Sequence, residues 1–101
     1  MLILEVVHWN IKEGQEIEFE LAFAEAQKIL ISITGYVSHR FQKCIENPKR
    51  YILLVEWKKL EDHTEGFQKS HKYEDDKKLI TPFIEPGTSL EHFNMVSRNT
   101  L

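Results

Sequence analysis

The chain has 101 residues, a net charge of −3 and one cysteine, and its acidic and basic residues are mixed along the sequence. This length suits one domain with its own core, so we expect a single domain over residues 1–101. A nucleic-acid-binding protein usually carries a basic stripe, and one cysteine excludes an internal disulfide or a cysteine-based zinc cluster. The apolar runs are shorter than the roughly 18 residues that span a bilayer, and the N-terminus does not resemble a signal peptide. We therefore expect a cytoplasmic protein that binds neither nucleic acid nor membrane.

The first half of the chain predicts a strand, a helix and a second strand. Residues 2–10, LILEVVHWN, are rich in the β-branched and aromatic residues that favour a strand. Residues 15–33 carry apolar side chains at three- and four-residue spacing, which is the pattern of an amphipathic helix, and Gly35 is placed to end it. Residues 36–46 return to alternation, which indicates a strand.

The second half predicts a hairpin and two helical segments. NPKR at residues 47–50 is a turn sequence, and it is followed by the apolar strand YILLVEW at residues 51–57. Residues 60–69 predict a short helix with one face formed by Leu60, His63, Thr64 and Phe67. Residues 71–80 predict a second helical segment with one side formed by Tyr73, Lys77 and Ile80. Pro82 interrupts this second helix, because proline cannot continue the hydrogen-bond ladder.

The last part of the chain completes a sheet. Residues 89–96, SLEHFNMV, predict the fourth strand, and residues 97–101 are expected to form a frayed tail. The resulting order β-α-β-β-α-β is that of the ferredoxin-like fold. We therefore expect an α+β protein with a four-stranded antiparallel sheet, one face of which is covered by both helices.

Alternation along the strands predicts which side chains face the helices. This set comprises Val7, Trp9, Val37, His39, Phe41, Leu53, Val55 and Trp57. The opposite set comprises Val6, Tyr36, Arg40, Leu54, Glu56 and His92. Because the second face is too apolar to leave in water, we expect a homodimer in which two sheets close on each other. Arg40, Glu56 and His92 would then be buried and paired inside, since buried charges need partners.

The segment YILLVEWKKLEDHTEGF, residues 51–67, suggests a pocket. Trp57 ends the buried strand, His63 follows six residues later, and Phe67 lies one helical turn beyond. Two aromatic side chains beside a histidine, whose ordinary pKa of about 6.5 allows proton exchange near neutrality, suit a flat organic molecule. Core packing would produce nearly the same pattern, with Trp57 as a lid over the core and His63 as a solvated helix residue.

The order of elements and the segment LLVEWKKLEDHTEGF resemble the antibiotic biosynthesis monooxygenase family, whose members are small dimeric α+β barrels. The resemblance covers residues 2–96. It is carried by EGQEIEFELAFAEA at the start of the first helix, by Gly35, by VEW at the end of the third strand and by the closing SLEHF. These markers are specific for the fold family and much less specific for a reaction.

The resemblance implies oxygenation of a small aromatic or quinol-like substrate, with molecular oxygen as co-substrate and no cofactor. A deprotonated polyphenol can itself pass an electron to oxygen, so the protein must bind it, remove a proton and exclude water. In this chain the resemblance assigns Trp57 to holding the ring and His63 to taking the phenolic proton, with His39 as the alternative base. Lys77 falls where a relative carries a cation that steadies the anion.

The substrate would bind against Phe67, His39, Val7 and Leu53. The haem-degrading branch of the family differs, because it has an asparagine in the first strand and a histidine ligand late in the second helical region. In this chain Val7 and Lys77 occupy the corresponding places, so we expect neither haem nor a metal site.

Two other functions agree with the same residues. An isomerase or degradative enzyme for a small oxygenated metabolite would use the pocket to move protons, and it would turn over without oxygen. A non-catalytic dimer that binds a small ligand would change the fluorescence of Trp57 without forming a product.

Overall fold

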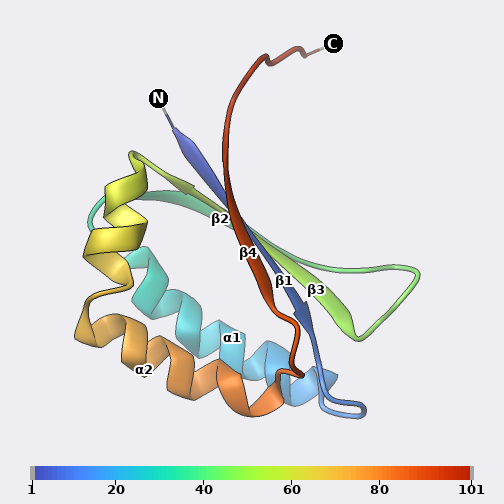
Figure 1. The fold of residues 1–101 in the computed structure, drawn as a ribbon. Coiled ribbons are helices and arrows are strands. Elements are labelled where there is room, and N and C mark those ends of the chain that lie inside the picture. The colour runs from blue at the N-terminus through green and yellow to red at the C-terminus, as the bar shows by residue number, and fades with distance from the viewer. Residues whose placement is uncertain (1, 101) are drawn as a thin grey trace.

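The computed structural model describes residues 2–100 and has the element order expected from the sequence (Figure 1). The strands are β1 (Ile3–Asn10), β2 (Tyr36–Lys43), β3 (Arg50–Trp57) and β4 (Ser89–Asn94). The helices are α1 (Glu16–Ile31) and α2 (His71–Ile80), with a π-helical turn η1 (Asp62–Phe67) before α2 and a 3-10 turn η2 (Thr81–Phe83) after it. Leu101, the end of the expected tail, lies outside the described residues.

One antiparallel sheet carries both helices on the same side (Figure 1). Its strand order is β2-β3-β1-β4, which is the ferredoxin-like arrangement, with β2 and β4 at the two edges. Apolar side chains from the sheet and from α1 fill the space between the layers, and they include Ile11, Phe19, Ala26, Tyr51, Val55 and Trp57. The predicted α+β fold with its four-stranded antiparallel sheet is therefore confirmed.

Strand β2 contains a β-bulge that changes which of its side chains face the helices. Its pairing with β3 shifts so that Tyr36 lies opposite Trp57 and Ser38 lies opposite Glu56. Tyr36 therefore packs against the core, while Val37 is the extra residue and is 40% exposed. The prediction from alternation was wrong for Tyr36 and Val37, because a bulge adds one residue to one strand and resets the alternation.

Strand β4 places His92 on the helix side of the sheet. His92 pairs with Glu5, and Glu5 pairs with Val55 on its other side. Residues directly opposite one another share a face, and Val55 is fully buried beneath the helices. The prediction that His92 is buried with Arg40 and Glu56 on the open face was therefore wrong. A short edge strand with few apolar residues gives little sign of its register, which its partner strand sets.

The first of the two expected helical segments is the π-helical turn η1 rather than an α-helix over residues 60–69. Gly35, before β2, has a φ of +89° and accepts a backbone hydrogen bond from Lys58 at 2.8 Å. A β-carbon at this position would collide with the carboxyl group of Asp62, so the glycine allows a close approach. This approach places η1 over the end of β3.

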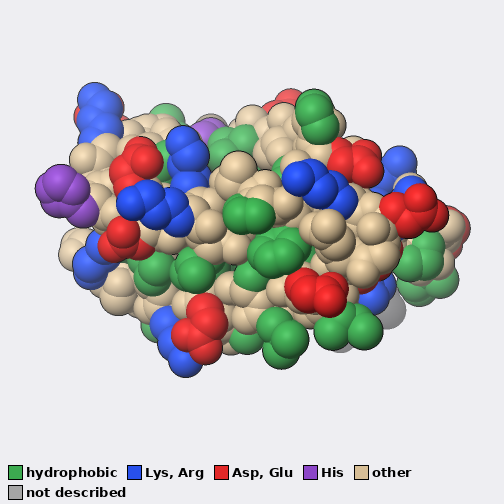
Figure 2. All heavy atoms as spheres, turned by 90° about the horizontal axis from the view of Figure 1, so that it is seen from below, with side chains coloured by type: hydrophobic (Ala, Val, Ile, Leu, Met, Phe, Trp, Pro, Cys, Tyr) green, Lys and Arg blue, Asp and Glu red, His purple; other side chains and the backbone are tan. Residues whose placement is uncertain are grey.

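The second helical segment, α2, spans residues 71–80 as predicted. It begins at Ser70, whose hydroxyl accepts the backbone N–H of Tyr73 at 3.3 Å. Seen from the helix side, acidic and basic side chains surround a band of hydrophobic ones (Figure 2). Within residues 2–100, every helix is too short or too polar to cross a bilayer.

Two of the apolar side chains expected on the face opposite the helices, Val6 and Leu54, lie there. The strand register puts Leu4, Val6 and Leu54 on this face together with Arg40 and Glu56. Ser38 donates a hydrogen bond to the carboxylate of Glu56 at 2.8 Å. Within this chain the helices leave this face open to solvent (Figure 1).

Candidate functional site

A cavity of about 430 Å³ lies between the sheet and the two helices. Residues of β1 and β3 line it on one side, α1 and α2 line it on the other, and η1 lies at its edge. Apolar side chains dominate the lining, among them Val7, Phe23, Leu30, Leu53, Phe67 and Ile80. Small-molecule sites occupy roughly 300–1,000 Å³, so this cavity can hold a small aromatic molecule.

Glu5 is a buried polar residue in the cavity lining. This residue belongs to β1, shares the inward-facing side of the strand with Val7 and Trp9, and is only 5% exposed. Its Oε1 atom accepts a hydrogen bond from the indole N–H of Trp57 at 2.9 Å. Trp57 is itself fully buried, and a buried indole N–H needs an acceptor. The pair therefore satisfies the tryptophan and holds the carboxyl group in one orientation.

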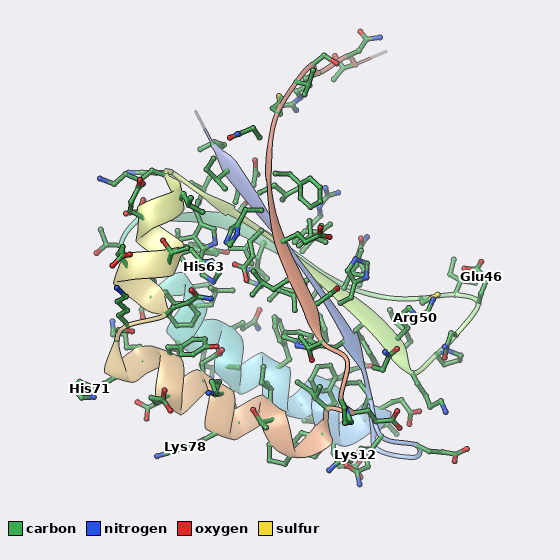
Figure 3. The ribbon with its side chains drawn as sticks, in the orientation of Figure 1. Lys12, Glu46, Arg50, His63, His71 and Lys78 are labelled. Carbon is green, nitrogen blue, oxygen red and sulfur yellow. The ribbon has the colours of Figure 1, made fainter. Side chains whose placement is uncertain are left out.

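His63 connects Glu5 to His92. Its Nε2 atom lies 3.4 Å from Oε2 of Glu5, and its Nδ1 atom lies 2.7 Å from Nε2 of His92. The His63 ring also stacks on Trp57, with 5.3 Å between ring centres and 23° between the planes. Figure 3 shows His63 on the side of η1 that faces the sheet. Four side chains from β1, β3, η1 and β4 thus form one continuous polar network.

Burial shifts the pKa values within this network. It raises the pKa of Glu5 from 4.5 to about 7, with the Trp57 hydrogen bond opposing the rise and the charge of Asp76 adding to it. Burial and the neighbouring His92 lower the pKa of His63 from 6.5 to about 4. Near neutral pH, His63 is therefore uncharged and Glu5 is divided between its acid and its carboxylate. An acid with this pKa can both accept and release a proton near pH 7.

Helix α2 adds a second carboxyl group and a cation. Asp76 lines the cavity, and burial raises its pKa from 3.8 to about 6. Lys77 also lines the cavity, and its Nζ atom lies 5.3 Å from the centre of the Tyr73 ring. Two acids with pKa values near neutrality in one cavity are a combination typical of proton-transfer sites.

Five of the residues predicted for the site line this cavity, namely Val7, Leu53, His63, Phe67 and Lys77. Trp57 does not line it and instead stacks on His63 and Phe67 from within the core. His39 faces the helix side as expected, but its ring contacts the hydroxyl of Tyr36 at 2.6 Å and a glutamine of α1 at 3.2 Å. The structure therefore connects Trp57 to the cavity through Glu5 and holds His39 outside the cavity lining.

Three polar residues of the site were not predicted from the sequence, namely Glu5, Asp76 and His92. The sequence does contain an indication of Glu5, because this residue alternates with Val7 and Trp9 in the first strand. A carboxylate in such an inward-facing set is unusual. Asp76 lies three residues after Tyr73 on the helix, a spacing that places both on one side.

The family of the chain follows from comparison with known proteins. The model of the family described as antibiotic biosynthesis monooxygenase matches residues 2–77. The chain belongs to this family. A relative from Bacillus subtilis (strain 168), the uncharacterized protein YczJ, is 45% identical over 95 residues, which cover 94% of this chain and 100% of YczJ. The antibiotic biosynthesis monooxygenase resemblance expected from the sequence is therefore confirmed.

Two solved structures share the fold of this chain. A Bordetella bronchiseptica protein that carries the family name has a TM-score of 0.90 and 25% identity, with 95% of this chain and 98% of that chain covered. SnoaB from Streptomyces nogalater, a cofactor-independent oxygenase, has a TM-score of 0.82 and 16% identity, with 99% and 96% covered. At 16% identity, the likeness to SnoaB shows the shared fold alone.

Proposed function

We propose that this protein is a cofactor-independent monooxygenase that acts on a small aromatic or quinol-like substrate inside the cavity. The observation that carries the proposal is an apolar cavity containing the buried pair of Glu5 and His63. Membership of the antibiotic biosynthesis monooxygenase family supports it. Molecular oxygen would be the co-substrate, as expected from the sequence.

The cavity has the parts that this chemistry needs. Apolar side chains such as Leu53 and Phe67 can pack against a ring and exclude water. A ring hydroxyl directed at Glu5 and His63 would lose its proton there, leaving an electron-rich anion that can react with oxygen. Lys77, at the cavity wall, would stabilise the negative charge on the anion.

The overall reaction balances without an external reductant. A hydroquinone and one molecule of oxygen give a hydroxyquinone and one molecule of water. One oxygen atom enters the ring, and the two electrons that reduce the other atom to water come from the substrate itself. The protein's part is to bind the hydroquinone, move its proton and keep bulk water away.

The test is oxygen consumption by chelator-treated protein with a panel of hydroquinones and polyphenols. We expect uptake above the autoxidation rate and a loss of about 100-fold in His63→Ala, the usual range for a group involved in proton transfer. His71→Ala is the matched control, because His71 is exposed and points away from the cavity (Figure 3). Equal uptake in wild type and His63→Ala, or no uptake across the panel, would refute the proposal.

A second candidate is a proton-transfer enzyme such as an isomerase for a small oxygenated metabolite. The observation in its favour is the pair of acids facing one cavity, since burial raises the pKa of Glu5 to about 7 and that of Asp76 to about 6. One acid could remove a proton while the other returns it to a different atom. Turnover that continues under anaerobic conditions would favour this candidate over the oxygenase.

We also propose that the protein is a homodimer in which the open sheet faces meet, with Arg40 and Glu56 in the contact. The support is a groove of about 390 Å³ on this side, lined by residues that include Leu4, Leu54 and Phe93. Phe93 is 46% exposed in the single chain. Light scattering at micromolar concentration should give twice the chain mass, and Leu54→Glu should reduce it. A monomer in the wild type would refute the proposal.

A further inference from the structure

We propose that Glu5 is the group that exchanges a proton with the substrate, and that His63 and His92 connect Glu5 to solvent at the edge strand β4. This inference deepens the proposed function and, for its kinetic part, rests on it. The sequence had suggested His63 or His39 as the base. The contacts of the three side chains argue for a different division of roles.

The first argument concerns free hydrogen-bonding sites. The Nδ1 atom of His63 contacts Nε2 of His92 at hydrogen-bond distance, its Nε2 atom lies 3.4 Å from Oε2 of Glu5, and the residue is 1% exposed. A neutral imidazole has one donor and one acceptor, so a ligand could reach His63 only at Nε2, where it would compete with Glu5. A carboxylate oxygen has two lone pairs, so Oε2 of Glu5 can contact His63 and still accept a proton from the cavity. Glu5 is therefore the group placed to touch the substrate.

The second argument concerns access to water. Glu5 is 5% exposed, and a ligand in the cavity would cover it further. His92 lies on β4, at the edge of the sheet, and is only partly buried. The 2.7 Å contact between the two histidines is within hydrogen-bond distance, and a small movement of His63 or Glu5 from their 3.4 Å separation would complete the path. A proton can therefore move between cavity and solvent while the substrate stays in place.

The outward proton steps begin with His63 carrying its hydrogen on Nδ1, and protons are conserved at each step. When Glu5 takes the substrate proton, the substrate O–H bond breaks and its electron pair stays on the substrate oxygen. Glu5 then passes a proton to Nε2 of His63, while the hydrogen on Nδ1 moves to Nε2 of His92, which releases its other ring proton to water. His63 is left with its hydrogen on Nε2, and the same steps in reverse bring a proton from solvent to Glu5.

Several charged or titratable groups face Glu5 and contribute to its titration. His63 approaches from η1 and His92 from β4, while Asp76 and Lys77 line the cavity from α2. Glu85, in the segment after α2, also lines the cavity. The relay thus predicts a coupled titration, in which the protonation of Glu5 and the tautomer of His63 change together.

The first test needs no substrate and uses ¹⁵N nuclear magnetic resonance from pH 5 to 9. The indole N–H signal of Trp57, which donates to Glu5, should titrate with a midpoint near 7. Over the same range the two ring nitrogens of His63 should shift in opposite directions, because the ring changes tautomer without becoming charged. Both changes should be absent in Glu5→Gln, and an unchanged Trp9 signal would show that this variant is folded.

A His63 tautomer that stays fixed across this range would overturn the relay, and a Trp57 signal that titrates equally in Glu5→Gln would overturn the role of Glu5. These results do not depend on oxygenase activity. The relay and the proposed function can therefore fail separately.

The second test is kinetic and uses the best hydroquinone from the oxygen-uptake panel. We expect Glu5→Gln to lower kcat by about 100-fold and His92→Gln by about tenfold, with KM unchanged in the latter. Added imidazole should restore kcat in His92→Gln, because a small base can replace the missing proton carrier. His71→Gln, with the exposed histidine of α2 replaced, is the control. A raised KM in His92→Gln, or no response to imidazole, would assign His92 a structural role and overturn the relay.

Discussion

Replacing Glu5 with glutamine should stabilise the folded protein above neutral pH. Burial raises the pKa of Glu5 from 4.5 to about 7, and each pKa unit corresponds to about 1.4 kcal/mol. The ionised side chain therefore costs the folded state about 3 kcal/mol at pH 8. Because the folded pKa lies above the unfolded one, this loss of stability develops as pH rises from 4.5 through about 7. Glutamine has no such cost, and its amide can still accept from Trp57 and donate to His63.

The assay is thermal or denaturant unfolding of wild type and Glu5→Gln at pH 5 and pH 8. The variant should gain about 2 kcal/mol more at pH 8 than at pH 5, equivalent to roughly 10 °C in Tm for a domain of this size. The lowered pKa of His63 has the opposite effect on the pH dependence of stability. Because the fold favours neutral His63, the stability that this residue contributes is lost as pH falls from 6.5 to about 4. This contribution is common to both proteins.

The control for this experiment is Glu13→Gln, which replaces an exposed glutamate in the turn before α1 and should give the same difference from wild type at both pH values. A Glu5→Gln variant that is destabilised equally at pH 5 and pH 8 would refute the reasoning. That result would mean that the carboxylate of Glu5 is not penalised in the folded state.

Three further predictions concern the supports of the site. Gly35→Ala should destabilise the protein by about 1–3 kcal/mol in denaturant unfolding, because the position has a φ of +89° and its β-carbon would collide with Asp62. The hydrogen bond from Trp57 lowers the pKa of Glu5, so Trp57→Phe, which removes this bond, should raise that pKa further. A titration of the Glu5 carboxyl group followed by ¹³C nuclear magnetic resonance will measure the change. Leu90→Trp should reduce oxygen uptake while changing Tm little, because Leu90 lines the cavity yet is 39% exposed.

The fold was predictable because its elements differ in hydrophobic period. The three- and four-residue spacing of α1 and the alternation in β1 and β3 indicated the order of elements, and α2 has the bounds that were expected. The errors about which side chains face the helices fell on the two edge strands. The bulge between Tyr36 and Ser38 and the register of His92 both depend on partner strands, and the local sequence does not contain that information.

The candidate site was predictable only in part, because its central group looks ordinary in the sequence. His63 and Phe67 stood out as a polar and an aromatic residue near a strand-end tryptophan, and both line the cavity. Glu5 lies among apolar residues of β1, and its partners Trp57 and His63 are more than fifty residues away in the chain. A network formed by such distant residues becomes visible only when the strands are paired.

The energetic cost of Glu5 is itself an argument for a functional role. The fold needs an acceptor for the buried indole N–H of Trp57, but a neutral amide would supply that acceptor without an ionisation penalty. A carboxyl group in this position costs stability at neutral pH and gains a pKa of about 7. A pKa near neutrality is useful to a group that accepts and releases protons, whereas it contributes nothing to packing. If Glu5→Gln proves more stable and less active, the carboxyl group serves the chemistry of the cavity; if it proves more stable and equally active, Glu5 is not the proton-exchanging group.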